Sequence, residues 1–135
     1  MTHYSRLYKV VIDVPEGDHD KELTFWQEAI GQTLTPLQRY PEYHGAFLPG
    51  DVFALLIQRI GTGPARVHLD IHTDDLEAET ARLEALGARR LRLVNDHWCV
   101  MEDPAGLPFC IIPQPPGTLN DDNAQRWDDP DGRVQ

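Results

Sequence analysis

KVVIDV at residues 9–14 and RVHLDI at residues 66–71 are two versions of one strand-like motif, and this repetition decides the fold. Each motif leads into a charged segment with a similar helix end, EAIG at residues 28–31 and EALG at residues 84–87. An internal repeat outranks local propensity as evidence for architecture. Two copies are too few for an open solenoid, so we expect a pseudo-symmetric pair that binds ligands where the copies face each other.

The composition is that of a single domain with an acidic surface. The chain has 135 residues and a net charge of −10, and a domain of this size buries about two thirds of its unfolded surface. Nucleic acids and anionic membranes attract Lys and Arg rather than carboxylates, so the charge argues against both as partners. It either serves solubility or attracts a cationic ligand.

The start of the chain has no apolar run typical of a signal peptide, and no stretch approaches the roughly 18 apolar residues of a membrane span. We therefore expect a cytoplasmic protein. Its two cysteines flank a predicted hairpin turn, EDPAGLP at residues 102–108. If Val100 pairs with Cys110, Cys99 points to the opposite face, because side chains alternate along a strand. We expect two free thiols.

Strand and helix signals follow the same order in both copies. In the first copy we predict a strand at 8–14, a helix from about residue 18 to 30, and strands near 33–39, 43–48 and 52–60. In the second copy we predict a strand at 65–73, a helix at 75–86, and strands at 89–94, 98–102 and 109–113. Asp18 and Asp74 are the predicted helix caps, and Glu77 completes a capping box with Asp74.

The composition changes abruptly after the second copy. QPPGTLNDDNAQRWDDPDGRVQ, residues 114–135, is acidic, rich in Pro and almost free of aliphatic residues, which predicts a loose tail. Trp127 is the exception, and it either docks on the domain or stays with the tail. The predicted organisation is a domain at 1–113, built from repeats at 8–60 and 65–113, followed by the tail.

The β-α-β-β-β order, HLDIHTDDLEAETARLEALGA at residues 68–88 and DPAGLPFC at residues 103–110 together resemble the vicinal oxygen chelate superfamily. Glyoxalase I, extradiol dioxygenases, fosfomycin-resistance proteins and bleomycin-binding proteins belong to it. The resemblance covers residues 8–113 and is closest to the small bacterial glyoxalase-like domains. It implies an α+β domain of two βαβββ modules forming a cupped mixed sheet, and we expect a homodimer. It implies no particular reaction.

In the metalloenzymes of this superfamily, the ligands come from the first and last strands of each copy. The resemblance places His68 at a ligand position, Val11 at its counterpart, and Cys110 where Glu is usual. Gln58 is the only plausible donor in the remaining strand. A catalytic ion needs about three protein ligands, so we expect no cofactor and no stoichiometric metal. A zinc site from His68, Cys110 and His72 is the chemically possible alternative.

A polar face is predicted on the first strand of the second copy. Val67, Leu69 and Ile71 suit packing under the helix, which leaves His68, Asp70 and His72 on the opposite face. That face either lines a solvated cup or is an ordinary exposed sheet face. The resemblance and the repeat agree that this face is the concave one, which favours the cup.

Further residues are assigned to the same cup. Trp98, Val100 and Cys110 share the predicted face, where Trp98 is either an aromatic pocket wall or a core residue. Asp13 is the repeat partner of Asp70 and has either a structural role, such as holding an Arg, or a ligand role. Other aromatic residues are less well placed by the sequence: His44, Tyr40 and Tyr43 could edge the cup, whereas His3 and His19 look like surface residues.

Two classes of function remain. One is a lyase, isomerase or dioxygenase relative in which His68 is the catalytic general base or part of an atypical metal site. The other is a binding protein, similar to the bleomycin-resistance proteins, that sequesters a small cationic or aromatic molecule. The missing ligands favour the binding protein, while His68 and Cys110 together keep the enzyme possible.

Overall fold

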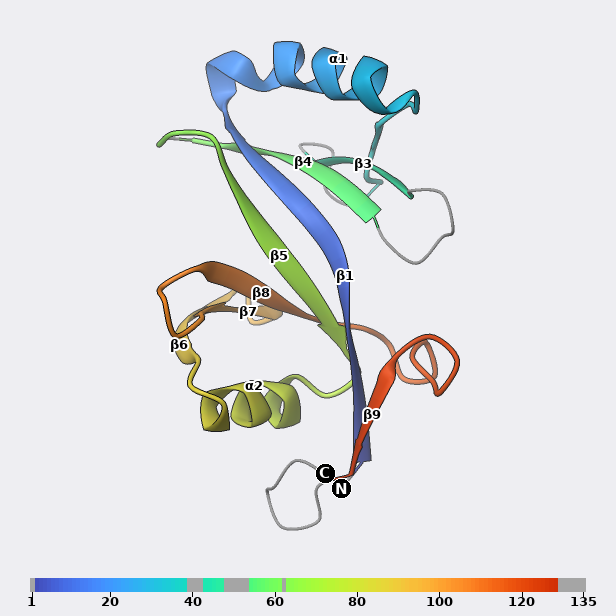
Figure 1. The fold of residues 1–135 in the computed structure, drawn as a ribbon, viewed down its shortest axis with the longest axis vertical. Helices are drawn as coiled ribbons and strands as arrows, with labels where there is room; N and C mark the ends of the chain where they lie inside the picture. The colour runs from blue at the N-terminus through green and yellow to red at the C-terminus, as the bar shows by residue number, and fades with distance from the viewer. Residues whose placement is uncertain (1, 39–42, 48–53, 62, 129–135) are drawn as a thin grey trace. The chain divides into compact units, whose positions relative to one another are not determined.

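The computed structural model describes residues 2–38, 43–47, 54–61 and 63–128 (Figure 1). The chain divides into two compact units. The N-terminal unit is Lys9–His68, and the C-terminal unit combines Met1–Tyr8 with Leu69–Gln135. Strands β1 (Thr2–Pro15) and β5 (Arg66–Thr73) each contribute residues to both units. None of the described helices is long and apolar enough to cross a bilayer.

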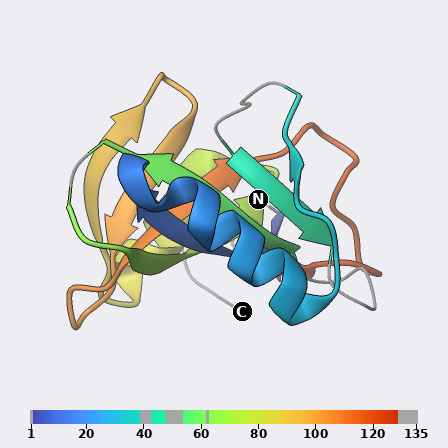
Figure 2. The ribbon, with the colours of Figure 1, turned by 90° about the horizontal axis from the view of Figure 1, so that it is seen from above.

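The N-terminal unit follows the predicted order of one strand, one helix and three strands. After β1 come the short 3-10 helix η1 (Glu16–Asp18), α1 (His19–Ile30), β2 (Thr35–Pro36), β3 (Tyr43–Phe47) and β4 (Ala54–Ile60). The strands are ordered β2-β3-β4-β1, and β1 with β4 is the parallel pair. The apolar residues of helix α1 pack against Val14 and Ile57. Figure 2 shows α1 in front of the strands of its own unit. Gly31 ends this helix with a φ of 70°.

The C-terminal unit repeats this topology strand for strand. Strand β5 is followed by α2 (Leu76–Ala85), β6 (Arg89–Val94), β7 (Trp98–Glu102) and β8 (Pro108–Pro113). The order is β5-β8-β7-β6, and β5 with β8 is again the parallel pair. The α+β fold with two βαβββ modules is therefore confirmed.

The predicted core face of the second repeat is right in its centre and wrong at its start. Leu69 and Ile71 pack with Met101 and Ile111 beneath α2, as expected. Val67, in contrast, is 51 % exposed. The pairing of β5 with β8 begins only at Leu69, so the strand has no partner from β8 at Val67.

Both predicted helix caps need correction. Asp18 precedes α1 but makes no capping hydrogen bond, and its carboxylate pairs with Lys21 at 3.0 Å. The cap of α2 is Asp75 rather than Asp74, because the Asp75 carboxylate accepts from the Ala78 amide at 3.0 Å. Asp74 is one residue too early, and its carboxylate accepts instead from the amide of Tyr4 at 2.8 Å.

Glu77 also has a role other than the predicted one. It forms an ion pair with Arg90 on β6, with the closest oxygen and nitrogen 2.9 Å apart, and it does not complete a capping box with Asp74. The hydrogen bonds from Arg90 lower the pKa of Glu77 despite the opposing effect of partial burial. This pair fastens α2 to the edge strand of its own unit.

The described part of the predicted loose tail, residues 114–128, ends in a docked strand. Residues Gln125–Asp128 make strand β9, which pairs antiparallel with Thr2–Ser5 of β1 (Figure 1). The indole nitrogen of Trp127 donates to Ser5 Oγ at 2.9 Å. The Arg82 guanidinium lies 3.9 Å from the centre of the Trp127 ring, a cation–π contact. This pairing explains why β1 begins at Thr2 rather than at the predicted Tyr8.

His3 is buried, so its predicted surface location is wrong. It is 2 % exposed, and its Nε2 lies 2.8 Å from the carboxylate of the fully buried Glu79. Arg82 donates two further hydrogen bonds to Glu79, each of 2.8 Å. Burial by itself raises the pKa of Glu79, but the hydrogen bonds from Arg82 and His3 outweigh it and hold the pKa below 4.5. The network joins β1, α2 and the docked tail.

We predict that Glu79→Gln destabilises the protein at pH 7 by about 3–5 kcal/mol, the usual cost of removing one partner from a buried charge pair. Because the folded pKa of Glu79 is lowered, its contribution is present above the unfolded pKa of 4.5 and is lost as the pH falls below it. Urea unfolding at pH 7 and pH 3 measures the difference from wild type. Glu77→Gln is the exposed control, with an expected loss of about 0–1 kcal/mol. Equal losses for the two variants would contradict the burial argument.

Candidate functional site

The first and last strands of each repeat lie side by side and carry polar residues at equivalent positions. In the N-terminal unit, Asp13 of β1 is paired with Gln58 of β4. In the C-terminal unit, Asp70 of β5 is paired with Cys110 of β8. Gln58 and Cys110 therefore occupy matching places in the two repeats.

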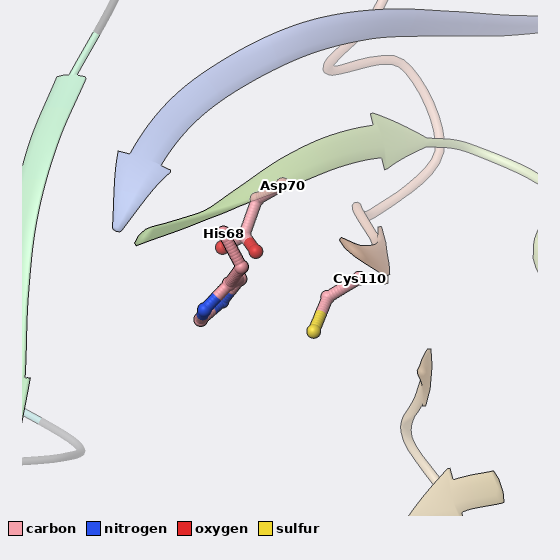
Figure 3. A group of neighbouring side chains, drawn as sticks. All are labelled: His68, Asp70 and Cys110. Atoms are coloured by element: carbon pink, nitrogen blue, oxygen red, sulfur yellow. The ribbon is translucent and has the colours of Figure 1, made fainter. Parts of the chain in front are cut away.

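Three potential ligand residues gather on β5 and β8. His68 and Asp70 are two residues apart on the continuous strand β5, and Cys110 lies beside Asp70 on β8. One ligand atom from each residue lies within 4.8 Å of the other two. Figure 3 shows the three side chains leaving their strands on the same side. Asp70 is buried, whereas His68 and Cys110 are partly buried. We call these three residues the β5 cluster.

The hairpin register places the two thiols as expected. Val100 pairs with Cys110, and Cys99 pairs with Ile111. Cys99 belongs to the core beneath α2, and both cysteines are free thiols. Burial raises the pKa of Cys99. This favours the protonated thiol, which is less reactive than the thiolate.

Trp98 and His72 were predicted to share the polar face, and the ring of each contacts another aromatic ring. Trp98 is half-buried at the start of β7, with its ring 5.9 Å from that of His97. Alternation along β7 puts Trp98 and Val100 on the side opposite Cys99. The His72 ring is buried and stacks on Tyr8, with the ring centres 4.3 Å apart. His72 is not a member of the β5 cluster.

Asp13 holds both an Arg and a His in the N-terminal unit. Its Oδ2 lies 2.8 Å from His68 Nδ1 and 3.1 Å from Arg66 Nε, and the residue is only 2 % exposed. An Arg partner for Asp13 was predicted from the sequence, but the contact with His68 was not. The available signal was the repeated Asp, which recurs on the first strand of each copy. Val11, two residues before Asp13, is buried in the same unit.

A second histidine group was not expected from the sequence. His19 is 2 % exposed, so its predicted surface location is wrong. Its ring lies 5.0 Å from that of His44, and its Nδ1 lies 3.3 Å from Arg59 Nη2. Burial, with smaller effects from His19 and Arg59, lowers the pKa of His44. Tyr40 lies outside the described residues, and the Tyr43 hydroxyl accepts from the Gln58 side chain at 3.4 Å.

The residues at the superfamily's metal-ligand positions do not form a complete donor set. Val11 cannot bind a metal, and at the other three positions stand Gln58, His68 and Cys110. The β5 cluster offers an alternative set of imidazole, carboxylate and thiol, which suits zinc. However, its 4.8 Å limit is wider than the roughly 3.5 Å between ligand atoms of a closed tetrahedral zinc site. The β5 cluster therefore has side chains of the types that bind zinc, but their ligand atoms are spaced more widely than in a closed zinc site.

Comparison with known proteins identifies the family. A family model described as "Glyoxalase-like domain" matches residues 9–112. The chain belongs to the glyoxalase-like domain family. A comparison with curated proteins found no match.

Solved structures share the fold of this glyoxalase-like domain. A hypothetical protein from Bacillus halodurans C-125 has 13 % identity and a TM-score of 0.60, with 86 % of this chain and 99 % of that chain covered. Methylmalonyl-CoA epimerase from Mycobacterium tuberculosis has 17 % identity and a TM-score of 0.54, with coverages of 81 % and 88 %. The Streptomyces coelicolor methylmalonyl-CoA epimerase has 16 % identity and a TM-score of 0.53, with coverages of 87 % and 98 %. These likenesses show that the chain shares its fold with those proteins, and they assign no reaction.

Proposed function

We propose that this glyoxalase-like domain binds a small organic molecule at the β5 cluster and does so without the superfamily's metal. The observation that carries the proposal is the gathering of His68, Asp70 and Cys110 within 4.8 Å on two neighbouring strands. A few polar side chains that converge in a buried or partly buried setting are typical of small-molecule sites. The Val11 side chain has no donor atom, which argues against a metal bound at the superfamily's four ligand positions.

The chemistry of these residues favours a cationic or aromatic ligand. Asp70 is a carboxylate with 4 % exposure, and the whole chain carries a net charge of −10. The attraction between a positive group and a carboxylate is stronger where water is partly excluded, because the local dielectric constant is lower. Trp98 on the neighbouring hairpin offers an aromatic face to a flat or cationic molecule. Sequestration of such a compound, as in bleomycin-resistance proteins, fits these features.

A metal-dependent enzyme is the second candidate. It is favoured by the donor chemistry of the β5 cluster, because imidazole, carboxylate and thiolate are all zinc ligands. In that case His68, Asp70 and Cys110 would hold the ion, and the ion would act as a Lewis acid on the substrate. The two candidates differ in whether the purified protein contains metal.

We predict that the purified protein contains less than about 0.1 equivalent of divalent metal, because the family positions lack the three ligands that a tightly bound ion needs. Elemental analysis of the full chain, with metal-free buffer as the blank, measures the content. About one equivalent of zinc that is lost in both His68→Ala and Cys110→Ser, but kept in His97→Ala, would make the metal enzyme the better candidate.

Ligand binding is tested with a panel of quaternary ammonium compounds and aromatic amines in a thermal-shift assay. We expect at least one probe to stabilise the wild type, and we expect Asp70→Asn and Trp98→Ala to weaken its binding about tenfold each, through loss of about 1.4 kcal/mol of charge or cation–π attraction. His97→Ala, which alters an exposed residue next to Trp98, is the matched control. Equal binding by all four proteins would contradict the proposed site.

A further inference from the structure

The contacts of Asp13 are unusual for a residue in the interior. Its Oδ2 is close to two nitrogens, His68 Nδ1 at 2.8 Å and Arg66 Nε at 3.1 Å. Its Oδ1 is buried and has no hydrogen-bond partner among the described residues. A buried oxygen without a partner is costly and calls for a specific explanation.

The two contacts of Oδ2 determine which nitrogen of His68 carries the proton. Arg66 is always protonated and can only donate, so Oδ2 accepts from it. An oxygen that accepts from Arg66 is a carboxylate oxygen, and it must accept from His68 as well. His68 Nδ1 is therefore the donor, and in the neutral ring Nε2 is then the nitrogen with a lone pair.

We propose that Asp13 and His68 form an acid–base dyad in which Asp13 is the positioning residue and His68 Nε2 exchanges a proton with the bound molecule. This inference rests on the proposed function, because it needs a small molecule at the β5 cluster. The chemical class of ligand is a molecule with a weakly acidic C–H, N–H or O–H group. The dyad needs no metal, so it gives the metal-free site an activity.

The proton transfer balances within the site. His68 Nε2 takes a proton from the ligand, and the electron pair of the broken bond stays on the ligand. The ring becomes an imidazolium, and the Asp13 carboxylate, with its second oxygen unpartnered, offsets the new positive charge. Return of the proton from Nε2 to the ligand restores the neutral ring, so no oxidant or reductant is consumed.

The repeat supplies a matched control for this role. Asp70 is the counterpart of Asp13 and lies on the same strand as His68, but its paired residue is Cys110. The contact on which the dyad rests is that of Asp13 Oδ2 with His68 Nδ1, at 2.8 Å. A neutral amide at position 13 could donate to Nδ1 and would then move the ring proton to Nε2. We expect the same change at position 70 to keep the contact between Asp13 Oδ2 and Nδ1.

The tautomer is measured directly on ligand-free, full-length, ¹⁵N-labelled protein by long-range nitrogen–proton correlation of the imidazole rings. We expect wild-type His68 to be protonated at Nδ1, and Asp13→Asn to shift the proton to Nε2. Asp70→Asn should leave the proton at Nδ1. Protonation of the wild-type ring at Nε2 overturns the proposal even if Asp13→Asn does not fold.

The acid–base step is measured as solvent-deuterium exchange into acetylacetone, a small C–H acid, in D₂O. We expect wild type to accelerate the exchange, and His68→Gln and Asp13→Asn to lose about 10²-fold of that acceleration, the lower end for general acid–base catalysis. His97→Ala is the control. Exchange that is equal in wild type and His68→Gln overturns the step. The tautomer result does not depend on ligand, so a correct tautomer with no bound probe would count against the proposed function alone.

Discussion

Parallel pairing between the first and last strands of each repeat is the constraint on which the structure depends. Strand β1 pairs with β4, and β5 pairs with β8, in the same topology. Parallel strands cannot be joined by a tight turn and need a long connection, which one helix and two strands supply in each repeat. The register of these pairs sets Asp13 beside Gln58 and Asp70 beside Cys110. The candidate site is thus a product of strand register rather than of any local motif.

The features that depend on local pattern could be predicted from the sequence. The repeat predicted the order of the elements. Alternation along the strands predicted the inward positions of Leu69 and Ile71 and the opposite orientations of Cys99 and Cys110. Predictions failed where neighbouring residues were equally suitable. Asp74 and Asp75 are both good caps, and only the contact of Asp74 with Tyr4 in the folded chain decides between them.

Partners that are distant in sequence could not be predicted. His3 and Glu79 are 76 residues apart, and Asp13 and His68 are 55 apart. A histidine in a polar stretch has the same local sequence whether it is exposed or joined to a buried carboxylate. The docking of Trp127 depends on Arg82 and Ser5 in the same way. These long-range contacts turn a list of polar residues into a buried network and an acid–base pair, and only the fold brings them together.

The register of β5 against β8 is tested most directly by a single engineered cysteine. Asp70→Cys puts a second thiol opposite Cys110, and paired positions on adjacent strands have Cα separations within the range of a disulfide. Mild oxidation followed by peptide mapping without reductant identifies the bond. The account predicts an intramolecular disulfide between the introduced thiol and Cys110, with Cys99 remaining free. A bond to Cys99, which belongs to the core beneath α2, or no bond at all, would contradict the register and with it the β5 cluster.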